Sequence, residues 1–229
     1  DIVIHSAAIS NVQKADDLPQ RKVFEINVKV TDEIAMLCDK YGAKLIYIST
    51  DLVYAGYRGS FLKEDAKLIP ASIYAETKLM GEIKIQNVFD NFIILRMALL
   101  YGFGLNHTKN HFQEIYYKLK NGKTVDLFLD QFRTPLSVID SARMLSEICS
   151  LNLKNEIINF GGKERVSRVE LGEILCNIAN LDKNLINKIY MKEIPDLPIV
   201  EDVSMNIDKL ISFGIQPKSI EESINEILF

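Results

Sequence analysis

The chain has 229 residues, 48% of them apolar, which is enough to bury a large core in one domain or in a domain with a smaller lobe. A formal net charge of -4 and scattered basic residues give no electrostatic surface for nucleic acid or anionic lipid, so we expect no partner of either kind. No apolar run approaches the roughly 20 residues that span a bilayer. The three cysteines lack C-x-x-C spacing and fit a reducing cytoplasm.

Short apolar strands and amphipathic helices alternate over the first hundred residues. In chain order we predict a strand over 1–6, a helix over 23–41, a strand over 44–49, a helix over 74–89 and a strand over 91–100. Gly42 marks the end of the first helix. This alternation predicts a parallel sheet with crossover helices. Because the first strand is apolar on both faces, we also expect further strands before Asp1.

The alternation weakens beyond residue 100. We predict a helix over 111–119 and a strand over 156–160 that returns to the main sheet. Two later helices open with capping boxes, formed by Ser167 with Glu170 and by Ser219 with Glu222. The whole pattern predicts an α/β fold with a Rossmann-like, doubly wound parallel sheet that is incomplete at the N-terminus. A smaller C-terminal lobe over 101–229 completes it.

A tyrosine and a lysine four residues apart, Tyr74 and Lys78, are the central chemical signal. On a helix they share one face, about one turn apart. An ammonium group favours a nearby phenolate, so we expect Lys78 to lower the pKa of Tyr74 from its usual value near 10. The phenol could then pass a proton to a carbonyl oxygen. The alternative is an interfacial tyrosine and a solvated lysine.

The same spacing joins Tyr116 to Lys120, so spacing alone does not choose between the two pairs. Only Tyr74 follows a predicted strand that ends in a run of hydroxyl and carboxyl side chains, at 49–51. Ligands of parallel α/β sheets bind at the carboxyl edge of the strands. We therefore place the candidate site at Tyr74 and interpret Tyr116 and Lys120 as ordinary helix residues.

Three segments carry a family resemblance: ISTDLVYAG (48–56), YAETKLMGE (74–82) and ILRMALLYG (94–102). With these segments, the chain resembles the extended short-chain dehydrogenases/reductases over nearly its whole length. Within that group it resembles the dTDP-4-dehydrorhamnose reductase family most. The resemblance implies an oxidoreductase that uses NADP or NAD. It also implies that residues 1–100 are the remainder of a dinucleotide-binding domain with the catalytic residues, and that 101–229 mainly bind a nucleotide-sugar substrate.

The catalytic set of the family is a threonine, a tyrosine and a lysine, which Thr50, Tyr74 and Lys78 match. By resemblance, Thr50 hydrogen-bonds the substrate carbonyl, Tyr74 donates the proton and Lys78 holds the nicotinamide ribose. Asn27 resembles the asparagine that serves the catalytic site through a backbone-linked water relay. The alternative for Asn27 is a polar residue on a helix face.

Further matches concern the two ligands. The residues that resemble the cofactor side, besides Tyr74 and Lys78, are Ser6, Ala7, Ala8 and Ser49. A strand end that merely needs small side chains is the alternative for the first three. On the substrate side we place Thr50, Asp51 and Arg133. Arg133 stands where the reductases carry a glycine; its planar fork suits a nucleotide diphosphate, and the alternative is a surface arginine.

The family's glycine-rich loop, which cradles the cofactor pyrophosphate, has no counterpart in residues 1–229. We therefore expect part of the dinucleotide-binding domain to precede Asp1, and the sequence leaves the choice between NADP and NAD open. His107 and His111 lie four apart but lack the glutamate of H-E-x-x-H and a third ligand. We expect no metal.

Three functions are consistent with the sequence. The first is reduction of a nucleotide-linked 4-keto-6-deoxy sugar, as in dTDP-rhamnose biosynthesis. The second is a nucleotide-sugar epimerase; a dehydratase is excluded because Leu52 stands where that enzyme needs a glutamate. The third is a non-catalytic regulatory subunit that resembles the methionine adenosyltransferase beta subunit. A homodimer is a possible assembly for any of them.

The missing glycine-rich loop leads to a binding prediction. Because pyrophosphate binding depends on backbone donors of that loop, the 229-residue chain by itself should bind NADPH weakly. Calorimetric titration of the chain with NADPH measures this affinity. Micromolar binding would show that the phosphate site lies within residues 1–229 after all.

Overall fold

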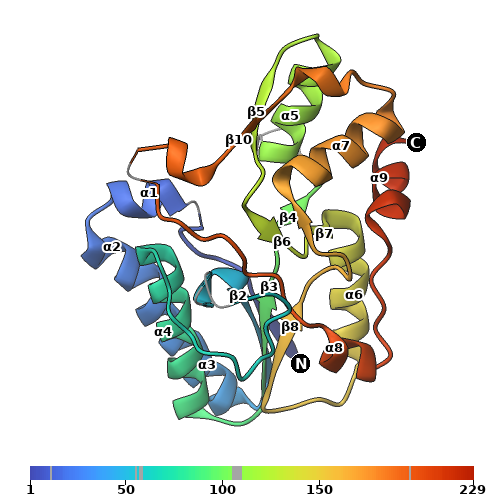
Figure 1. Cartoon of the computed structure of the whole chain (residues 1–229). Coiled ribbons are helices and arrows are strands. Elements are labelled where there is room, and N and C mark those ends of the chain that lie inside the picture. Colours follow the sequence, from blue (N-terminus) through green and yellow to red (C-terminus); the bar gives the residue numbers. More distant parts are fainter. Residues whose placement is uncertain (11, 55, 57–58, 105–109, 196) are drawn as a thin grey trace.

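A computed structural model describes residues 1–10, 12–54, 56, 59–104, 110–195 and 197–229 (Figure 1). His107, which we considered as a metal ligand, lies outside the described residues. Within them, no three His, Cys, Asp or Glu side chains are grouped as a metal ion would require. No helix in these ranges is both long enough and apolar enough to cross a membrane.

The main sheet is parallel throughout and has the strand order β1-β2-β3-β8. Its strands are β1 (Ile2–His5), β2 (Lys44–Thr50), β3 (Phe92–Met97) and β8 (Glu156–Phe160). All four were predicted, but the strand expected over 91–100 is wrong in its length. The chain turns away from the sheet after Met97, and β4 (Leu100–Tyr101) pairs instead with β7 (Leu136–Ser137).

Helices cover both faces of this sheet, because side chains of successive strand residues point to opposite faces. On one face, Leu45 and Tyr47 of β2 pack against α3 (Val30–Tyr41) and α4 (Ile73–Val88). The other face packs against α6 (Val138–Ser150) and α8 (Asp208–Ser212). Figure 1 shows these helix layers on either side of the strands. The predicted α/β, doubly wound class is confirmed.

The helix predicted over 23–41 contains a π-helical turn that its residue pattern does not predict. It consists of α2 (Gln20–Phe24), a π-helical turn (Glu25–Lys29) and α3, and it ends at Gly42 in the left-handed conformation, with φ 66°. A shorter helix, α1 (Val12–Asp17), precedes it. π-turns widen a helix locally and often occur at functional sites. This one contains Asn27.

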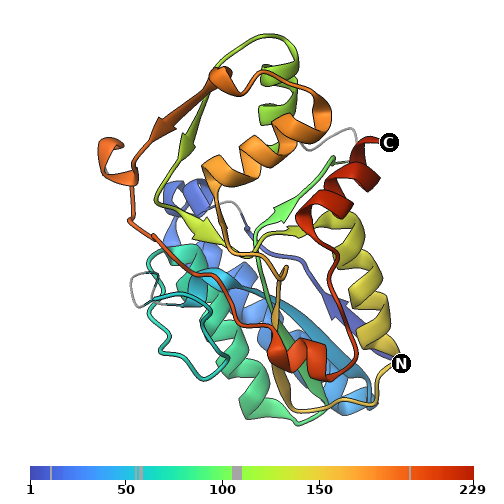
Figure 2. The same cartoon turned by 45° about the vertical axis from the view of Figure 1, so that its right-hand side comes forward.

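A second group of elements lies over the carboxyl ends of the main strands (Figure 2). It comprises α5 (His111–Lys120), β5 (Val125–Phe128), β6 (Phe132–Arg133), β9 (Val166–Ser167), α7 (Arg168–Ala179), β10 (Ile186–Ile189) and α9 (Ile220–Leu228), with short 3-10 turns at Lys183–Leu185 and Met191–Glu193. Strands β5 and β10 pair in parallel, and β6 and β9 pair antiparallel. The capping boxes predicted at the starts of α7 and α9 are both present.

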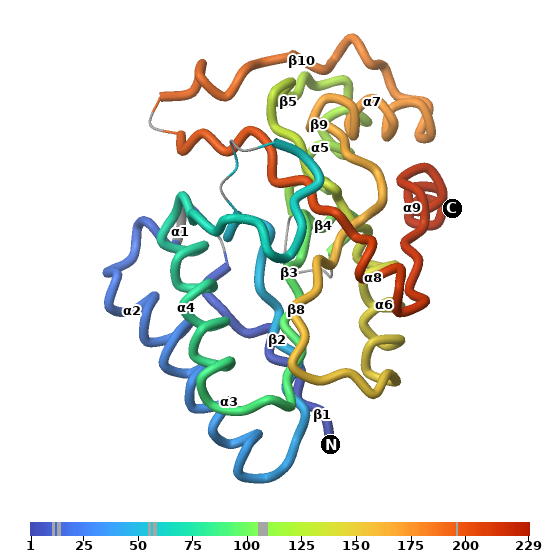
Figure 3. Tube along the Cα trace, turned by 60° about the horizontal axis from the view of Figure 1, so that its bottom comes forward, coloured from blue at the N-terminus to red at the C-terminus, as the bar shows by residue number. Residues whose placement is uncertain are grey.

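The C-terminal part of the chain then returns to the main sheet. Its segment before α8 runs beside the loop that follows β2, where Leu62 pairs with Met205 in a parallel bridge (Figure 3). The amide of Asp202 also donates to the carbonyl of Gly56. These contacts fasten the loop after β2, so the carboxyl edge of the sheet is enclosed by chain on several sides.

Helix α4 lies unusually close to β2. A Cβ atom at Gly81 would meet the hydroxyl group of Tyr47, so the glycine lets the helix approach the strand. The Tyr47 hydroxyl donates to the carbonyl of Lys78 at 3.4 Å. The close approach draws the inner face of α4, with Lys78, under the carboxyl edge of the sheet.

Candidate active site

A cleft of about 380 Å³ lies at the carboxyl edge of the main sheet. Its lining residues come from β2 and the turn after it, from α4, from the end of β3, from the loops after β1 and β3, and from β6 and α7. They are Ser6, Ala8, Ser10, Ile48, Ser49, Thr50, Asp51, Leu52, Tyr74, Lys78, Met97, Ala98, Leu99, Leu100, Arg133 and Arg168. The structure therefore brings most of the predicted site residues together in one cavity. Ala7 and Asn27 are not among the lining residues.

Thr50 and Tyr74 meet because two element boundaries coincide. Thr50 is the last residue of β2, and its hydroxyl accepts a hydrogen bond from the Leu52 amide at 3.3 Å, which opens the 3-10 turn Asp51–Val53. Ser72 caps α4 by accepting from the Ala75 amide, so Tyr74 lies in the first turn. The Thr50 hydroxyl lies beside that of Tyr74. Two hydroxyl groups thus lie together in the lining of the cleft.

Lys78 lies one turn further along α4 and is buried, with 2% of its surface exposed. Its Nζ atom lies 3.9 Å from the centre of the Tyr47 ring, in a cation–π contact. In the described part of the chain no acidic side chain forms an ion pair with it. Burial lowers the pKa of Lys78 to about 7, against an opposing effect of Glu82. The idea of a solvated lysine is therefore wrong.

The expected lowering of the Tyr74 pKa by Lys78 is also wrong. Burial raises the pKa of Tyr74 to about 12; the Thr50 hydroxyl acts in the opposite direction, and the Asp51 carboxylate adds to the rise. The reason is that the phenol is removed from water while the ammonium group of Lys78 is directed at Tyr47. Tyr74 therefore keeps its proton throughout the neutral pH range.

A buried ion pair underlies these residues. Glu82, one turn beyond Lys78, accepts from Arg96 of β3 at 2.8 Å, and the two side chains are 1% and 2% exposed. The hydroxyl of Ser49 donates to the same carboxylate. Arg96 also donates to the Tyr54 hydroxyl at 2.9 Å. Helix α4, β2 and β3 are thus joined by charge-assisted hydrogen bonds directly below the cleft.

Asn27 acts on the loop after β1 and does not contact the cleft. Its side-chain oxygen accepts from the Ile9 amide at 2.8 Å, and its nitrogen donates to the Ile9 carbonyl at 3.2 Å. The same nitrogen donates to the Thr77 hydroxyl at 3.1 Å, while the Asn27 carbonyl accepts from Thr31. The amide thus clamps a loop that lines the cleft to the neighbouring helices, and its predicted part in a water relay stays a prediction.

His5, just before that loop, is buried and neutral near pH 7. Its Nε2 atom lies 2.9 Å from the Thr31 hydroxyl, and burial, with the nearby charge of Lys78, lowers the pKa of His5 to about 4. The Thr31 hydroxyl also lies 2.8 Å from the Asn27 carbonyl, so it links the two residues. His5 therefore supports the wall of the cleft without adding charge to it.

Arg133 is buried, so the surface alternative is wrong. Its Nε atom lies 3.6 Å from Oδ2 of Asp51, and it donates to the carbonyl of Phe132 at 2.8 Å. Burial raises the pKa of Asp51, against the opposing charge of Arg133. Arg168, which we did not predict, lines the same cleft. Its place at the first position of α7, where cations are disfavoured by the helix dipole, was the available signal.

The second tyrosine–lysine pair lies elsewhere. Tyr116 and Lys120 belong to α5, their Nζ and hydroxyl atoms are 3.5 Å apart, and their contact is exposed. Neither residue lines the cleft at the carboxyl edge. Position, and not spacing, therefore distinguishes the two pairs, as predicted.

The cleft fits a nicotinamide cofactor in two respects. The side chains at the end of β1 and in the following loop are small, which leaves room for a flat or extended ligand against the strand end. The Lys78 ammonium has no hydrogen-bond acceptor in the described residues, so a hydroxyl-bearing ligand would supply one. Both features suit a ribose next to Lys78.

A sheet covered by helices on both faces, with a Tyr-x-x-x-Lys helix that begins at its carboxyl edge, is the arrangement of the short-chain dehydrogenase/reductase class, a family of NAD(P)-dependent proteins. The family model described as RmlD substrate binding domain matches residues 1–228. The chain belongs to this family, and the resemblance drawn from its motifs is confirmed.

Several relatives support the assignment at low identity. A probable low-salt glycan biosynthesis reductase, Agl14, of Haloferax volcanii is 26% identical over 196 residues, which cover 85% of this chain and 65% of that protein. The dTDP-4-dehydrorhamnose reductase of Aggregatibacter actinomycetemcomitans is 25% identical, covering 99% and 80%. Methionine adenosyltransferase 2 subunit beta of Xenopus laevis is 23% identical, covering 93% and 65%. The chain thus spans about two thirds to four fifths of these relatives.

Among solved structures, a dTDP-4-dehydrorhamnose reductase from Bacillus anthracis in complex with NADP superimposes with a TM-score of 0.89. The alignment covers 99% of this chain and 79% of that one, at 24% identity. At this identity the match shows the fold alone. It agrees with the Rossmann-like architecture described above.

The burial of Lys78 leads to a stability prediction. Its pKa falls from 10.5 to about 7 on folding, so the unfolded chain binds a proton that the folded chain lacks between these values. Stability therefore rises with pH through this window, and the cost of burying the charge is fully present below it. Lys78→Met should raise the free energy of unfolding more at about pH 6 than at about pH 9.

Urea unfolding of the chain and the variant at both pH values measures the difference. Lys84→Met is the matched control on the same helix, because the Lys84 side chain is 44% exposed and its ammonium pairs with Asp32 at the surface, so its removal should have a similar effect at both pH values. An equal effect of Lys78→Met at the two pH values would contradict the burial of a titrating ammonium.

Proposed function

We propose that the full-length protein reduces a nucleotide-linked 4-keto-6-deoxy sugar with NADPH or NADH. The observation that carries this proposal is the meeting of Thr50, Tyr74 and Lys78 in one cleft at the carboxyl edge of the sheet. The family membership and the reductases among the relatives support it. A nucleotide-sugar epimerase would use the same three side chains, so it remains the alternative.

Thr50 and Tyr74 would act on the carbonyl group of the substrate. When bound, the nicotinamide supplies a hydride to the carbonyl carbon. The hydroxyl groups of Thr50 and Tyr74 lie beside each other in the cleft, so both would hydrogen-bond a carbonyl oxygen bound there and stabilise the charge that develops on it. Tyr74, with a pKa of about 12, holds its proton until that oxygen becomes basic enough to take it. The product is an alcohol, and the phenolate that remains lies one helical turn from Lys78.

Lys78 would hold the ribose of the cofactor and neutralise the phenolate. Both roles require a protonated ammonium, and its pKa of about 7 in the described chain leaves it only partly protonated at neutral pH. A hydroxyl-rich ligand that accepts hydrogen bonds from Nζ favours the charged form. Cofactor binding should therefore raise the pKa of Lys78 and prepare it for the reaction.

On the substrate side, Asp51 and Arg133 pair with each other and line the same cleft as the small residues of the β1 loop. The guanidinium of Arg133 suits a nucleotide diphosphate, although its Nε is directed to Asp51. Leu52 supports a reductase over a dehydratase, since it offers no proton where the dehydratase needs a carboxylic acid.

A regulatory subunit is the second candidate function. The methionine adenosyltransferase subunits among the relatives favour it, because their identity to this chain is nearly that of the reductases. A protein of this kind would show no turnover with a keto sugar. It would instead co-purify with a partner enzyme and change its kinetics.

The role of Tyr74 can be tested by removal of one oxygen atom. In the full-length protein, Tyr74→Phe should lower turnover about 100-fold or more, as expected for loss of a positioned general acid, with little effect on cofactor affinity. Steady-state kinetics and cofactor titration measure the two effects. Tyr116→Phe is the matched control and should retain activity; the opposite result would place the site at the second pair.

Net consumption of the cofactor distinguishes the candidate functions. A reductase should oxidise one NADPH or NADH for each dTDP-4-keto-6-deoxyhexose reduced, and absorbance of the reduced nicotinamide would fall accordingly. Thr50→Val removes the hydroxyl at nearly constant shape and should slow this oxidation about 10-fold or more, because a hydrogen bond to the developing oxyanion is lost. Interconversion of sugars without a change in absorbance would indicate the epimerase instead.

A further inference from the structure

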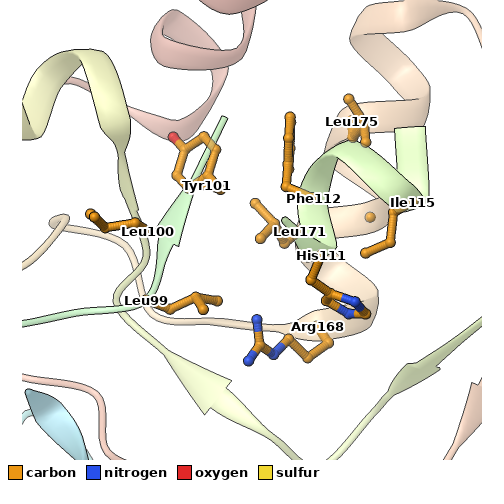
Figure 4. Close-up of a pocket in the computed structure, with 10 residues that line it drawn as sticks. Leu99, Leu100, Tyr101, His111, Phe112, Ile115, Arg168, Leu171 and Leu175 are labelled. Atoms are coloured by element: carbon orange, nitrogen blue, oxygen red, sulfur yellow. The ribbon is translucent and has the colours of Figure 1, made fainter. Parts of the chain in front are cut away.

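Arg168 occupies a central place that the proposed function leaves without a role. It is the first residue of α7, and it lines the cleft together with Asp51 and Arg133. It also lines a neighbouring cavity of about 230 Å³ beside Gln131 and Leu52. Figure 4 shows its guanidinium at the lower end of a third, small apolar cavity, near Leu99 and His111. One side chain thus borders three adjoining spaces.

The positive charge of Arg168 is poorly compensated. Its Nε atom donates to the neutral oxygen of Gln131 at 2.7 Å, and in the described residues no acidic side chain lies within ion-pair distance of it. The carboxylate of Asp51, whose charge favours the protonated form of Arg168, lies 3.6 Å from Nε of Arg133. The first turn of α7 adds a further unfavourable term, since helix N-termini repel cations.

The pKa of Arg168 agrees with this geometry. Burial and the charge of Arg133 lower it to about 9, and Asp51 only partly opposes them. A buried cation without a full counter-charge destabilises the folded state. A ligand that supplies the missing negative charge would recover, on binding, the electrostatic free energy that the buried cation costs on folding.

A second observation also points to a ligand. The Oδ2 atom of Asp51 is buried and has no hydrogen-bond donor among the described residues, and Asp51 is only 4% exposed. Buried polar atoms of this kind normally have a partner. Arg133 Nε is 3.6 Å away, beyond hydrogen-bond distance, and the Asp51 side chain lines the cleft, so a ligand hydroxyl group bound beside it would supply the missing donor. The wall therefore offers a cation for an oxyanion and, beside it, an acceptor for a hydroxyl.

We propose that Arg168 is a specificity-determining residue that binds an oxyanion, phosphoryl or carboxylate, on a hydroxylated ligand held against Asp51. Its terminal nitrogens have no acceptor in the described residues, so they can pair with two oxygens of such a group. The inference extends the proposed function, on which it rests for the identity of the cleft as the substrate site. It names a charged group that the substrate must carry.

Small probes test the subsite apart from the reduction. Pyrophosphate represents a phosphoryl source and D-glucuronate represents a carboxylate on a sugar ring; neither contains a nucleoside or a ketone. Calorimetry on the 229-residue chain should show binding of at least one probe, with a Kd of about 10 mM or lower. Arg168→Gln should weaken that binding about tenfold or more.

The matched control is Arg21→Gln, because the Arg21 side chain is 88% exposed and lies on α2, outside the cleft. It should leave the affinity unchanged. Arg168→Lys keeps the charge without the planar fork and should recover only part of the binding. Preference for pyrophosphate or for glucuronate identifies the source of the oxyanion, and either preference supports the proposal.

A purely structural role predicts a different set of results. If Arg168 stabilised the fold, Arg168→Gln would lower the unfolding temperature, whereas an uncompensated cation predicts an unchanged or higher one. A clear drop in this temperature would overturn the proposal. So would equal binding by the chain and the variant, or no binding of either probe. None of these results depends on whether the full-length protein reduces a keto sugar.

Discussion

The buried ion pair between Glu82 and Arg96 is the constraint on which the candidate site depends. It joins α4 to β3, and the bond from Ser49 to the same carboxylate adds β2. Removal of one partner from such a pair leaves the other charged and buried, at a cost of about 3–5 kcal/mol. The three elements therefore have essentially one mutual arrangement. Lys78, one turn before Glu82, takes its place from this arrangement.

The position of α4 in turn determines the ionisation of the cleft. Close contact with Tyr47 through Gly81 buries Lys78, while the cap at Ser72 places Tyr74 beside Thr50. The two catalytic candidates respond in opposite directions to burial, because one is charged when protonated and the other is neutral. In the described chain, the ammonium therefore releases its proton more readily than the phenol. The other charged side chains of the cleft are those of Asp51, Arg133 and Arg168.

Local features of the fold could be predicted from the sequence because they depend on neighbours in the chain. The strand at Glu156–Phe160, the stop at Gly42 and the capping box at Ser167 all follow from the types and spacing of a few adjacent residues. The nearness of Thr50 and Tyr74 also followed, because Thr50 ends a parallel strand and the helix after that strand begins at the same carboxyl edge.

Features that depend on distant contacts were missed. The π-turn around Asn27 has the same apolar spacing as an ordinary helix. The side-chain amide of Asn27 is hydrogen-bonded to Ile9, which lies 18 residues away in the sequence. The pKa of Tyr74 was predicted in the wrong direction, because the sequence gives the lysine's position on the helix but not the target of its ammonium. Arg96 did leave a signal that we overlooked, since a lone charge in a buried strand needs a buried partner.

The chemistry of the cleft depends most directly on the burial of Lys78, one helical turn from Tyr74. Nuclear magnetic resonance of the chain with labelled lysine can follow the Nζ signal of this residue through a pH titration, with Lys78→Met used to assign it. The structure predicts a pKa of about 7 for Lys78. A value near the ordinary lysine pKa of about 10.4 would show that the ammonium is solvated, and the arrangement of α4 described here would be wrong.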